Sequence, residues 1–268
     1  TKDKFSNLPF IVLPLDEQKK IVEYLDEKCS AIDQIVASKQ KQNEQLAEYR
    51  QSLITEAVTK GLNPSVPMKD SDIEWIGEIP EKWEISKIKH LLSTPITDGP
   101  HETPEILEEG IPFISAEAVK NLKVNFELKR GFISQIDHER FCFFCKPQFG
   151  DIFMVKSGAT TGNIARVDTH EEFSIWSPLA LIRVKNTVIK RDYMFYFLQS
   201  NLFRLQVELF WSYGTQQNIG MEVLENLYAP YPSLGMQQKI AAYLDKKCGE
   251  IDALREHNKN IIESLQEY

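Results

Sequence analysis

The chain has 268 residues, of which 42% are hydrophobic, and it carries a formal net charge of −8. This is enough chain for one mid-sized globular domain together with long helices, and no apolar run approaches the length of a membrane span. No secretory leader is visible, so the sequence predicts a cytoplasmic protein that makes no contact with a membrane.

One stretch of sequence occurs twice, once near each end. Residues 15–49 and 234–268 align without gaps at an offset of 219 positions, and 15 of the 35 aligned residues are identical. Two copies separated by a domain-sized insert do not form a solenoid. We therefore expect the two copies to act together as a frame for the insert.

The segment before the first copy is predicted to be the tail of an upstream domain, residues 1–13. Thr1 is not an initiator Met, and Asn7-Leu8 followed by Pro14-Leu15 parallels Asn226-Leu227 followed by Leu234. The first copy continues as a helical pattern to Gly61, a residue that often ends helices. The second copy stops at the equivalent of Tyr49, so the second helix is expected to be incomplete.

Each copy is predicted to be a long amphipathic helix, spanning residues 14–61 and 232–268. Apolar residues recur at spacings of three, four and seven. One heptad row in each copy is predicted to form the pairing seam: Leu25, Ile32, Lys39, Leu46 and Leu53 in the first copy, and Leu244, Ile251, Asn258 and Leu265 in the second. Polar residues at the middle of a coiled-coil seam, here Lys39 and Asn258, tend to fix register.

Chain geometry favours antiparallel pairing of these helices. The first helix would be roughly 65 Å long, and parallel helices would require the insert to carry the chain back over that distance. A compact insert with neighbouring termini joins antiparallel helices directly. The alternative is that the copies are two unrelated surface helices, each packed on its own domain.

The insert is predicted to be a mixed α+β domain. A turn-rich linker over 62–74 precedes it, and the domain itself spans 75–231. Its short apolar runs are typical of strands, and one longer amphipathic segment is typical of a helix; the runs are 111–115, 151–155 and 179–184, and the helix is 191–210. The predicted fold class is α+β, a mixed domain flanked by two long helices in an antiparallel coiled coil.

Neither a metal site nor a catalytic site is indicated by the sequence. Cys142 and Cys145, with His138 before them, suggest a metal, but a closed zinc site needs a fourth ligand and the usual second pair is absent. No phosphate-binding loop and no amino-methyltransferase motif is present, and Glu127-Leu128-Lys129 is a triplet that arises often by chance. We expect a non-catalytic protein without a cofactor or metal.

Several motifs together resemble one family. They are Pro14-Leu15 with Glu17-Gln18, Ile21 and Tyr24-Leu25-Asp26, then Trp75-Ile76-Gly77-Glu78-Ile79-Pro80 with Trp83, and Gly214-Thr215-Gln216-Gln217-Asn218-Ile219 before the second copy. In this order they resemble the DNA-specificity subunits of type I restriction-modification enzymes. The resemblance implies a target recognition domain over 75–231 between conserved-region helices, in a half-length piece that reads one half of a bipartite DNA target.

Three polar loops are the predicted DNA contacts. Small residues permit close backbone approach, hydroxyl and Lys side chains suit phosphates, and amides can bond adenine. The residues are Thr97, Asp98 and His101 in the first loop; Lys156, Ser157, Thr160 and Thr161 in the second; and Tyr213, Thr215, Gln216, Gln217 and Asn218 in the third. Ordinary turn chemistry is the alternative for each, and a structural role for 216–218 is as well supported as base contact.

The partners follow from the resemblance and from charge. Segment 75–230 holds 16 Lys and Arg against 20 Asp and Glu, so binding of double-stranded DNA is expected to need local cations and help from modification (methyltransferase) subunits. Restriction subunits would join through the complex, and a homodimer would restore two recognition domains. Two alternatives remain: a coiled-coil adaptor that binds only protein, and a recognition subunit of a related DNA-modification system.

Candidate phosphate contacts are Lys120, Lys123, Lys129, Arg130, Lys146, Lys156, Arg183 and Lys185.

Overall fold

The computed structural model describes residues 12–210 and 218–267. Contacts within the chain divide it into two units: a helix-pair unit of Thr1–Tyr49 and Glu250–Tyr268, and a globular unit of Arg50–Gly249. Each long helix passes from one unit into the other, so each unit contains part of both helices. Among the described residues, no helix is both long and apolar enough to cross a bilayer.

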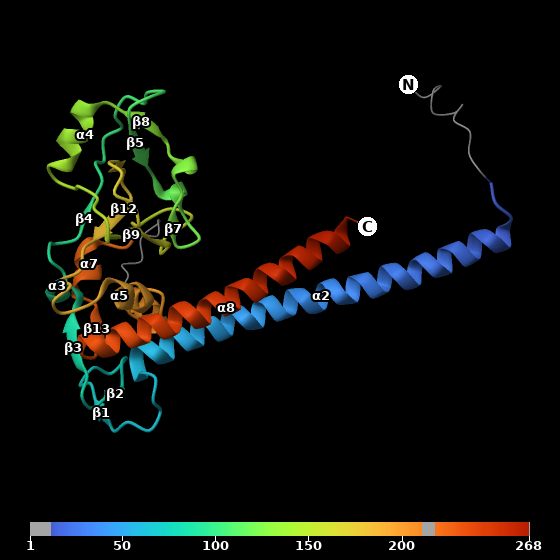
Figure 1. Ribbon diagram of the computed structural model, residues 1–268, viewed down its shortest axis with the longest axis horizontal. Helices are drawn as coiled ribbons and strands as arrows, with labels where there is room; N and C mark the ends of the chain where they lie inside the picture. The colour runs from blue at the N-terminus through green and yellow to red at the C-terminus, as the bar shows by residue number, and fades with distance from the viewer. Residues whose placement is uncertain (1–11, 211–217, 268) are drawn as a thin grey trace. The chain divides into compact units, whose positions relative to one another are not determined.

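The elements alternate helices and short strands in the order of a mixed α/β fold (Figure 1). The helices are α2 (Leu15–Lys60), α3 (Ile88–Leu91), α4 (Gln135–Cys142), α5 (Arg191–Phe197), α6 (Asn201–Phe210), α7 (Met221–Asn226) and α8 (Leu234–Gln266), with 3-10 turns η1 (Ala116–Ala118) and η2 (Phe126–Leu128). The strands are β1 (Met68–Asp70), β2 (Glu78–Pro80), β3 (Glu84–Lys87), β4 (Thr97–Asp98), β5 (Ile111–Ile114), β6 (Val119–Lys120), β7 (Lys123–Val124), β8 (Gly131–Ile133), β9 (Ile152–Val155), β10 (Ile164–Arg166), β11 (Ser174–Ile175), β12 (Leu179–Ile182) and β13 (Tyr228–Tyr231).

The two long helices begin in the same way, as the internal repeat predicts. Gln18 Nε2 donates to the carbonyl of Leu13 at 2.6 Å, and Gln237 Nε2 donates to the carbonyl of Pro232 at 2.8 Å. These four residues occupy matching positions at the offset of 219. The first turn of α2 contains two acids and that of α8 contains none, so the shared start does not depend on acidic capping.

The helices pair antiparallel. In the helix-pair unit, Asn258 Nδ2 donates to Asn43 Oδ1 at 3.1 Å. In the globular unit, Tyr243 of α8 lines one cleft together with Leu53 and Ala57 of α2. Later residues of α2 therefore lie beside earlier residues of α8, which confirms the predicted antiparallel direction. Figure 1 shows the two helices alongside each other.

The heptad row of α8 lies in a buried seam. Leu244, Ile251 and Asn258 are at most 6% exposed, and Leu265 is half-buried. The row continues into the globular unit because Leu244 belongs to that unit. Residues seven apart thus share one face over the length of the helix.

The heptad row of α2 differs from the prediction in two ways. Leu53 is buried and Ile32 and Leu46 are half-buried, but Leu25 is 50% exposed. In the register set by Asn43 and Asn258, Gln266 at the end of α8 lies opposite position 35, so the position opposite Leu25 falls outside the described part of α8. The second difference concerns the polar position of the seam. Asn258 bonds Asn43 and not Lys39. Lys39 Nζ instead donates to Gln42 Oε1 on its own helix at 3.2 Å.

The globular unit is built on two sheets that enclose a core. The larger has the strand order β4-β12-β9-β10-β7-β6, and the smaller has the order β11-β5-β8. Two-stranded pairs β1-β2 and β13-β3 complete the unit. The predicted strands at 111–115, 151–155 and 179–184 are confirmed as β5, β9 and β12.

Two predicted elements are corrected by the structure. The helix predicted over 191–210 is two helices, because Ser200 interrupts it: the Ser200 hydroxyl donates to the carbonyl of Phe197 at 2.7 Å and accepts from the N–H of Phe203 at 3.2 Å. The linker predicted over 62–74 contains β1, whose Met68 pairs with Pro80 of β2.

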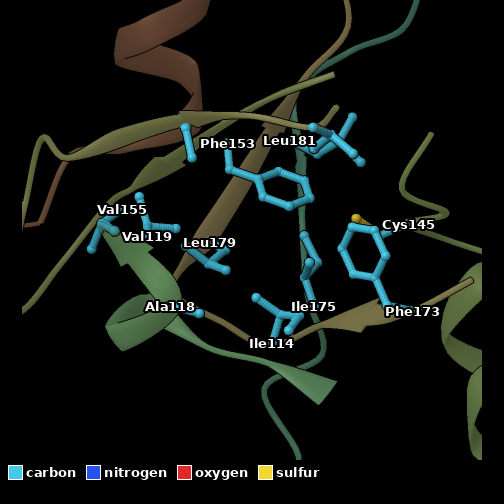
Figure 2. Packing of buried hydrophobic residues seen from close by; sticks show 12 residues of the cluster. Ile114, Ala118, Val119, Cys145, Phe153, Val155, Phe173, Ile175, Leu179 and Leu181 are labelled. Carbon is cyan, nitrogen blue, oxygen red and sulfur yellow. The ribbon is translucent and has the colours of Figure 1, made fainter. Parts of the chain in front are cut away.

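The core lies where the two sheets face each other (Figure 2). Phe153 and Val155 of β9 and Leu179 and Leu181 of β12 are spaced two apart, so each pair points to one face of the larger sheet. Ile114 and Ile175 come from the smaller sheet. The strands β9 and β12 of the larger sheet are buried at every position, as is typical of strands covered on both faces.

The end of α2 is part of this globular unit. The Tyr193 hydroxyl is fully buried and lies within hydrogen-bond distance of the carbonyls of Val58, at 3.1 Å, and Pro230, at 2.8 Å. Gly61 follows the helix with a φ of 83°, a left-handed conformation that suits glycine and ends helices. The segment linking α2 to the sheets is therefore held by buried contacts.

Candidate nucleic-acid interface

The predicted loops meet at the carboxyl end of β9. Lys156 directly follows this strand and donates its backbone N–H to the carbonyl of Pro178 at 2.9 Å. Its carbonyl accepts the N–H of Ile219 at 2.8 Å, and the next residue, Ser157, forms an isolated bridge with Asn218. Segments more than 60 positions apart in sequence are thereby joined at one strand end.

The side chain of Lys156 is committed to an ion pair. Lys156 is 7% exposed, and its Nζ donates to Asp98 Oδ2 at 2.6 Å. Asp98 lies on β4, which pairs with β12, and β12 in turn pairs with β9. This geometry opposes the interpretation of Lys156 as an exposed phosphate contact, because a buried ammonium already paired with a carboxylate would have to lose that pair first.

The first loop is held close to the sheet and exposes one side chain. Gly99 packs so tightly that a Cβ would lie 2.3 Å from the carbonyl oxygen of Ile175. Thr97 Oγ1 lies 3.5 Å from Cys145 Sγ. His101 remains largely exposed, with Nε2 3.4 Å from Asp98 Oδ2, so it is the member of this loop best placed to meet a partner.

The second loop connects β9 to β10 and projects from the sheet. Thr161 Oγ1 donates to the carbonyl of Gly158 at 2.7 Å, which closes a turn. Thr160 is exposed. Gly158 and Gly162 have φ values of 98° and 89° with open space around each, so the loop tip is accessible to a ligand backbone.

The third loop is described only in part. Asn218 is exposed and lies in the bridge with Ser157. The predicted contacts Tyr213, Thr215, Gln216 and Gln217 lie outside the described residues.

The cysteine pair forms no metal centre among the residues that the structure describes, where no group of three His, Cys, Asp or Glu could hold an ion. Cys142 Sγ lies 3.6 Å from the ring nitrogens of His138, and His138 Nδ1 lies 2.9 Å from Ser174 Oγ. Burial lowers the pKa of His138 and raises the pKa of Cys142. A neutral imidazole beside a protonated thiol is not an activated nucleophile.

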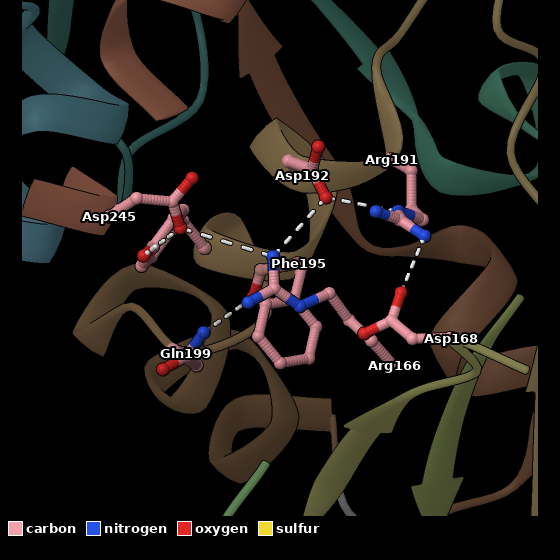
Figure 3. A network of polar contacts seen from close by, with 8 residues as sticks. Arg166, Asp168, Arg191, Asp192, Phe195, Gln199 and Asp245 are labelled. Carbon is pink, nitrogen blue, oxygen red and sulfur yellow. Dashed lines mark hydrogen bonds and ion pairs between the residues drawn. The ribbon is translucent and has the colours of Figure 1, made fainter. Parts of the chain in front are cut away.

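A polar network ties β10 to α5 and to the start of α8 (Figure 3). Its ion pairs are Arg166–Asp192 at 3.3 Å, Arg191–Asp192 and Arg191–Asp168 at 2.9 Å, and Arg166–Asp245 at 3.9 Å. Each of the two arginines thus contacts two carboxylates. Arg166 and Arg191 serve the fold of the globular unit and are not free for phosphate.

Known proteins share this arrangement of a mixed α/β unit between two copies of a long helix. A family model described as the type I restriction modification DNA specificity domain matches residues 80–264. The chain belongs to this family.

Individual relatives match nearly the whole chain. It is 26% identical to the MjaVIII type I restriction enzyme specificity subunit of Methanocaldococcus jannaschii, covering 97% of this chain and 60% of that one. It is 22% identical to the EcoBI specificity subunit of Escherichia coli, covering 93% and 53%. The chain thus spans a little over half the length of these curated relatives.

Solved structures show the same fold. A chain from a structural study of complex assembly and conformational transition in the type I R-M system superposes with a TM-score of 0.70 at 20% identity, over 96% of this chain and 57% of that one. The HsdS subunit from Thermoanaerobacter tengcongensis superposes with a TM-score of 0.55 at 17% identity, over 97% and 60%. The mixed α/β fold with paired long helices is therefore a fold of this family.

Proposed function

We propose that the chain recognises one half of a bipartite DNA sequence on behalf of a type I restriction-modification complex. In this proposal the globular unit contacts DNA, and the long helices dock modification subunits. The observation that carries the proposal is the family match, which spans most of the globular unit and most of α8. The gathering of the predicted loops at the end of β9 supports it.

The charge of the chain supports a division of labour. Segment 75–230 has four more acids than bases, and DNA affinity rises with the number of phosphates that cations neutralise. The chain alone should therefore bind DNA weakly. Modification subunits would supply further phosphate contacts and the methyl transfer, restriction subunits would join through the complex, and this chain would supply sequence discrimination without catalysis.

The proposal is tested by reconstituting the chain with the modification subunits of its own system. We expect methylation at one recurring sequence when the DNA product is sequenced. The modification subunits without the chain serve as the control and should leave the same DNA unmethylated. Methylation that is absent, or scattered without a common sequence, would contradict the proposal.

A mobility-shift measurement separates this function from the alternatives. A coiled-coil adaptor that binds only protein would give a complex with modification subunits and no shift of DNA. A recognition subunit of a related modification system would shift DNA together with its modification subunits, which would methylate that DNA, without ever associating with restriction subunits. Light scattering of the free chain tests the homodimer, which stays a prediction.

A further inference from the structure

Most cations that the sequence offers for phosphate binding are engaged inside the chain. The engaged residues are Lys146 with Glu172, Lys156 with Asp98, Arg183 with Asp151, Lys129 over the ring of Phe132 and Arg130 over the ring of Trp176. Three candidates, Lys120, Lys123 and Lys185, are exposed and have no ion-pair partner within 12–210 and 218–267. Of the cations that the sequence singled out, these three are therefore available to an external anion.

Lys120 lines a cleft with a further cation that the sequence did not single out. The cleft has a volume of about 590 Å³, and Arg204 of α6 lines it together with residues of the β6–β7 hairpin. Arg204 is exposed and also lacks an ion-pair partner in the described part of the chain. Glu208 is the one acid among the described residues that line the cleft.

The hairpin places two lysines on the same face. Lys120 of β6 and Lys123 of β7 are directly opposed across the antiparallel pair, and residues opposed in this way point to one side of the sheet. Two like charges in such positions repel each other. A bound phosphate between them would relieve this repulsion.

The turn between these lysines is a tight two-residue hairpin turn. Asn121 and Leu122 have φ values of 53° and 63°, as a type I′ turn requires at both central positions. The carbonyl of Leu122 accepts the N–H of Arg166 at 3.2 Å, which fixes the turn against β10. The hairpin therefore holds the two lysines in a defined place.

The second predicted loop forms another wall of the same cleft. Thr161, Gly162 and Asn163 line it, and the tip of this loop is open. The cleft therefore combines free cations with an accessible loop of small and polar residues, which is the composition expected where a protein tracks a nucleic-acid backbone.

We propose that this cleft holds one strand of the DNA target by its phosphates, with Lys120 and Arg204 of its lining as contacts and Lys123, which is paired with Lys120 on the hairpin, as a third contact beside it. The proposal rests on the proposed function and locates its DNA-binding surface. Lys156 then acts inside the protein, where it positions the loop, and the cations of the cleft face the DNA.

The salt dependence of DNA binding tests this proposal in the complex with modification subunits. Each phosphate contact contributes about 0.9 to the slope of log affinity against log salt, so the triple variant Lys120→Ala, Lys123→Ala, Arg204→Ala should lower the slope by about 2 to 3. Affinity should fall alike for a duplex that carries the sequence found by methylation mapping and for a scrambled duplex. The control is Lys69→Ala, Lys82→Ala, Lys89→Ala, which removes three exposed lysines outside the cleft that are not candidate phosphate contacts.

The outcomes separate this proposal from the function on which it rests. If the native complex does not distinguish the two duplexes, the proposed function fails. If it does, and the cleft variant matches the control in slope and affinity, the cleft does not hold DNA. A change in the preferred sequence would also overturn the assignment, since phosphate contacts carry no sequence information. If alanine lowers the melting temperature, the same three positions are changed to Gln and the slope is measured again.

Discussion

At the scale of single residues, the ion pair of Lys156 and Asp98 joins two of the predicted loops. Both side chains are about one-tenth exposed. Breaking such a pair leaves a buried charge, so Lys156→Ala should destabilise the globular unit by about 3 kcal/mol. Urea denaturation measures the loss.

The matched control removes both charges of this pair. Lys156→Met combined with Asp98→Asn should recover most of the lost stability, because no uncompensated charge remains. Unchanged stability of Lys156→Ala together with an equal loss of affinity for all DNA sequences would instead assign Lys156 to phosphate binding.

Gln237 and Gln18 are a matched pair supplied by the repeat. Gln237 is fully buried, accepts the N–H of Lys190 and donates to the carbonyls of Val188 and Pro232. Gln18 is exposed, and its side chain donates to the carbonyl of Leu13. Because Gln237→Ala leaves buried backbone groups unsatisfied, we expect a loss of about 2 to 3 kcal/mol.

The equivalent change Gln18→Ala should cost no more than about 0.5 kcal/mol in this chain. Both values follow from urea midpoints measured on the same preparation. Equal losses of stability in the two variants would show that the hydrogen bonds of Gln237 to Lys190 and Val188 do not stabilise the protein beyond the bond that both glutamines make at the helix start.

At the scale of elements, the two copies of the repeat bury equivalent faces to different extents. Leu244 is fully buried and its equivalent Leu25 is 50% exposed. Leu244→Asp places a charge in an apolar seam and should destabilise the chain by about 4 kcal/mol, whereas Leu25→Asp should change stability by less than about 0.5 kcal/mol. Thermal unfolding compares the stability of the two variants. A large loss of stability in Leu25→Asp would mean that the face around Leu25 is buried in the free chain.

Elements with long periodic patterns could be predicted from the sequence. The apolar spacing of the repeat predicted two long helices, as α2 and α8 confirm, and apolar runs located β5, β9 and β12. Strands of two residues, such as β4 and β6, are too short to show a period. The break at Ser200 was missed because the amphipathic pattern continues across it while a local hydroxyl bond stops the helix.

The candidate site could be predicted only in part. Glycines and polar residues identified the loops, since these residues have few other uses at strand ends. Burial of Lys156 could not be foreseen, because it depends on Asp98, 58 positions away. Likewise Lys120 and Arg204 share a cleft only through the tertiary fold.

At the scale of the whole molecule, the proposed function would dock modification subunits on the face of the first copy that is exposed among the described residues. Cys29 on this face is exposed, and its equivalent Cys248 is buried. A thiol reagent should label Cys29 rapidly and Cys248 slowly in the free chain, as read by peptide mass spectrometry. Assembly with modification subunits should protect Cys29; rapid labelling of Cys29 in a DNA-binding complex would place the docking surface elsewhere.

The central claim is that the globular unit determines which DNA sequence is recognised while the helices serve assembly. The most direct test replaces residues 61–233, which lie between the end of α2 and the start of α8, with the matching segment of the EcoBI relative. The methylation that this variant produces with the chain's own modification subunits is then mapped. We predict that one half of the methylated sequence changes to a new sequence and that methylation continues. An active complex that still methylates the original sequence would contradict the account.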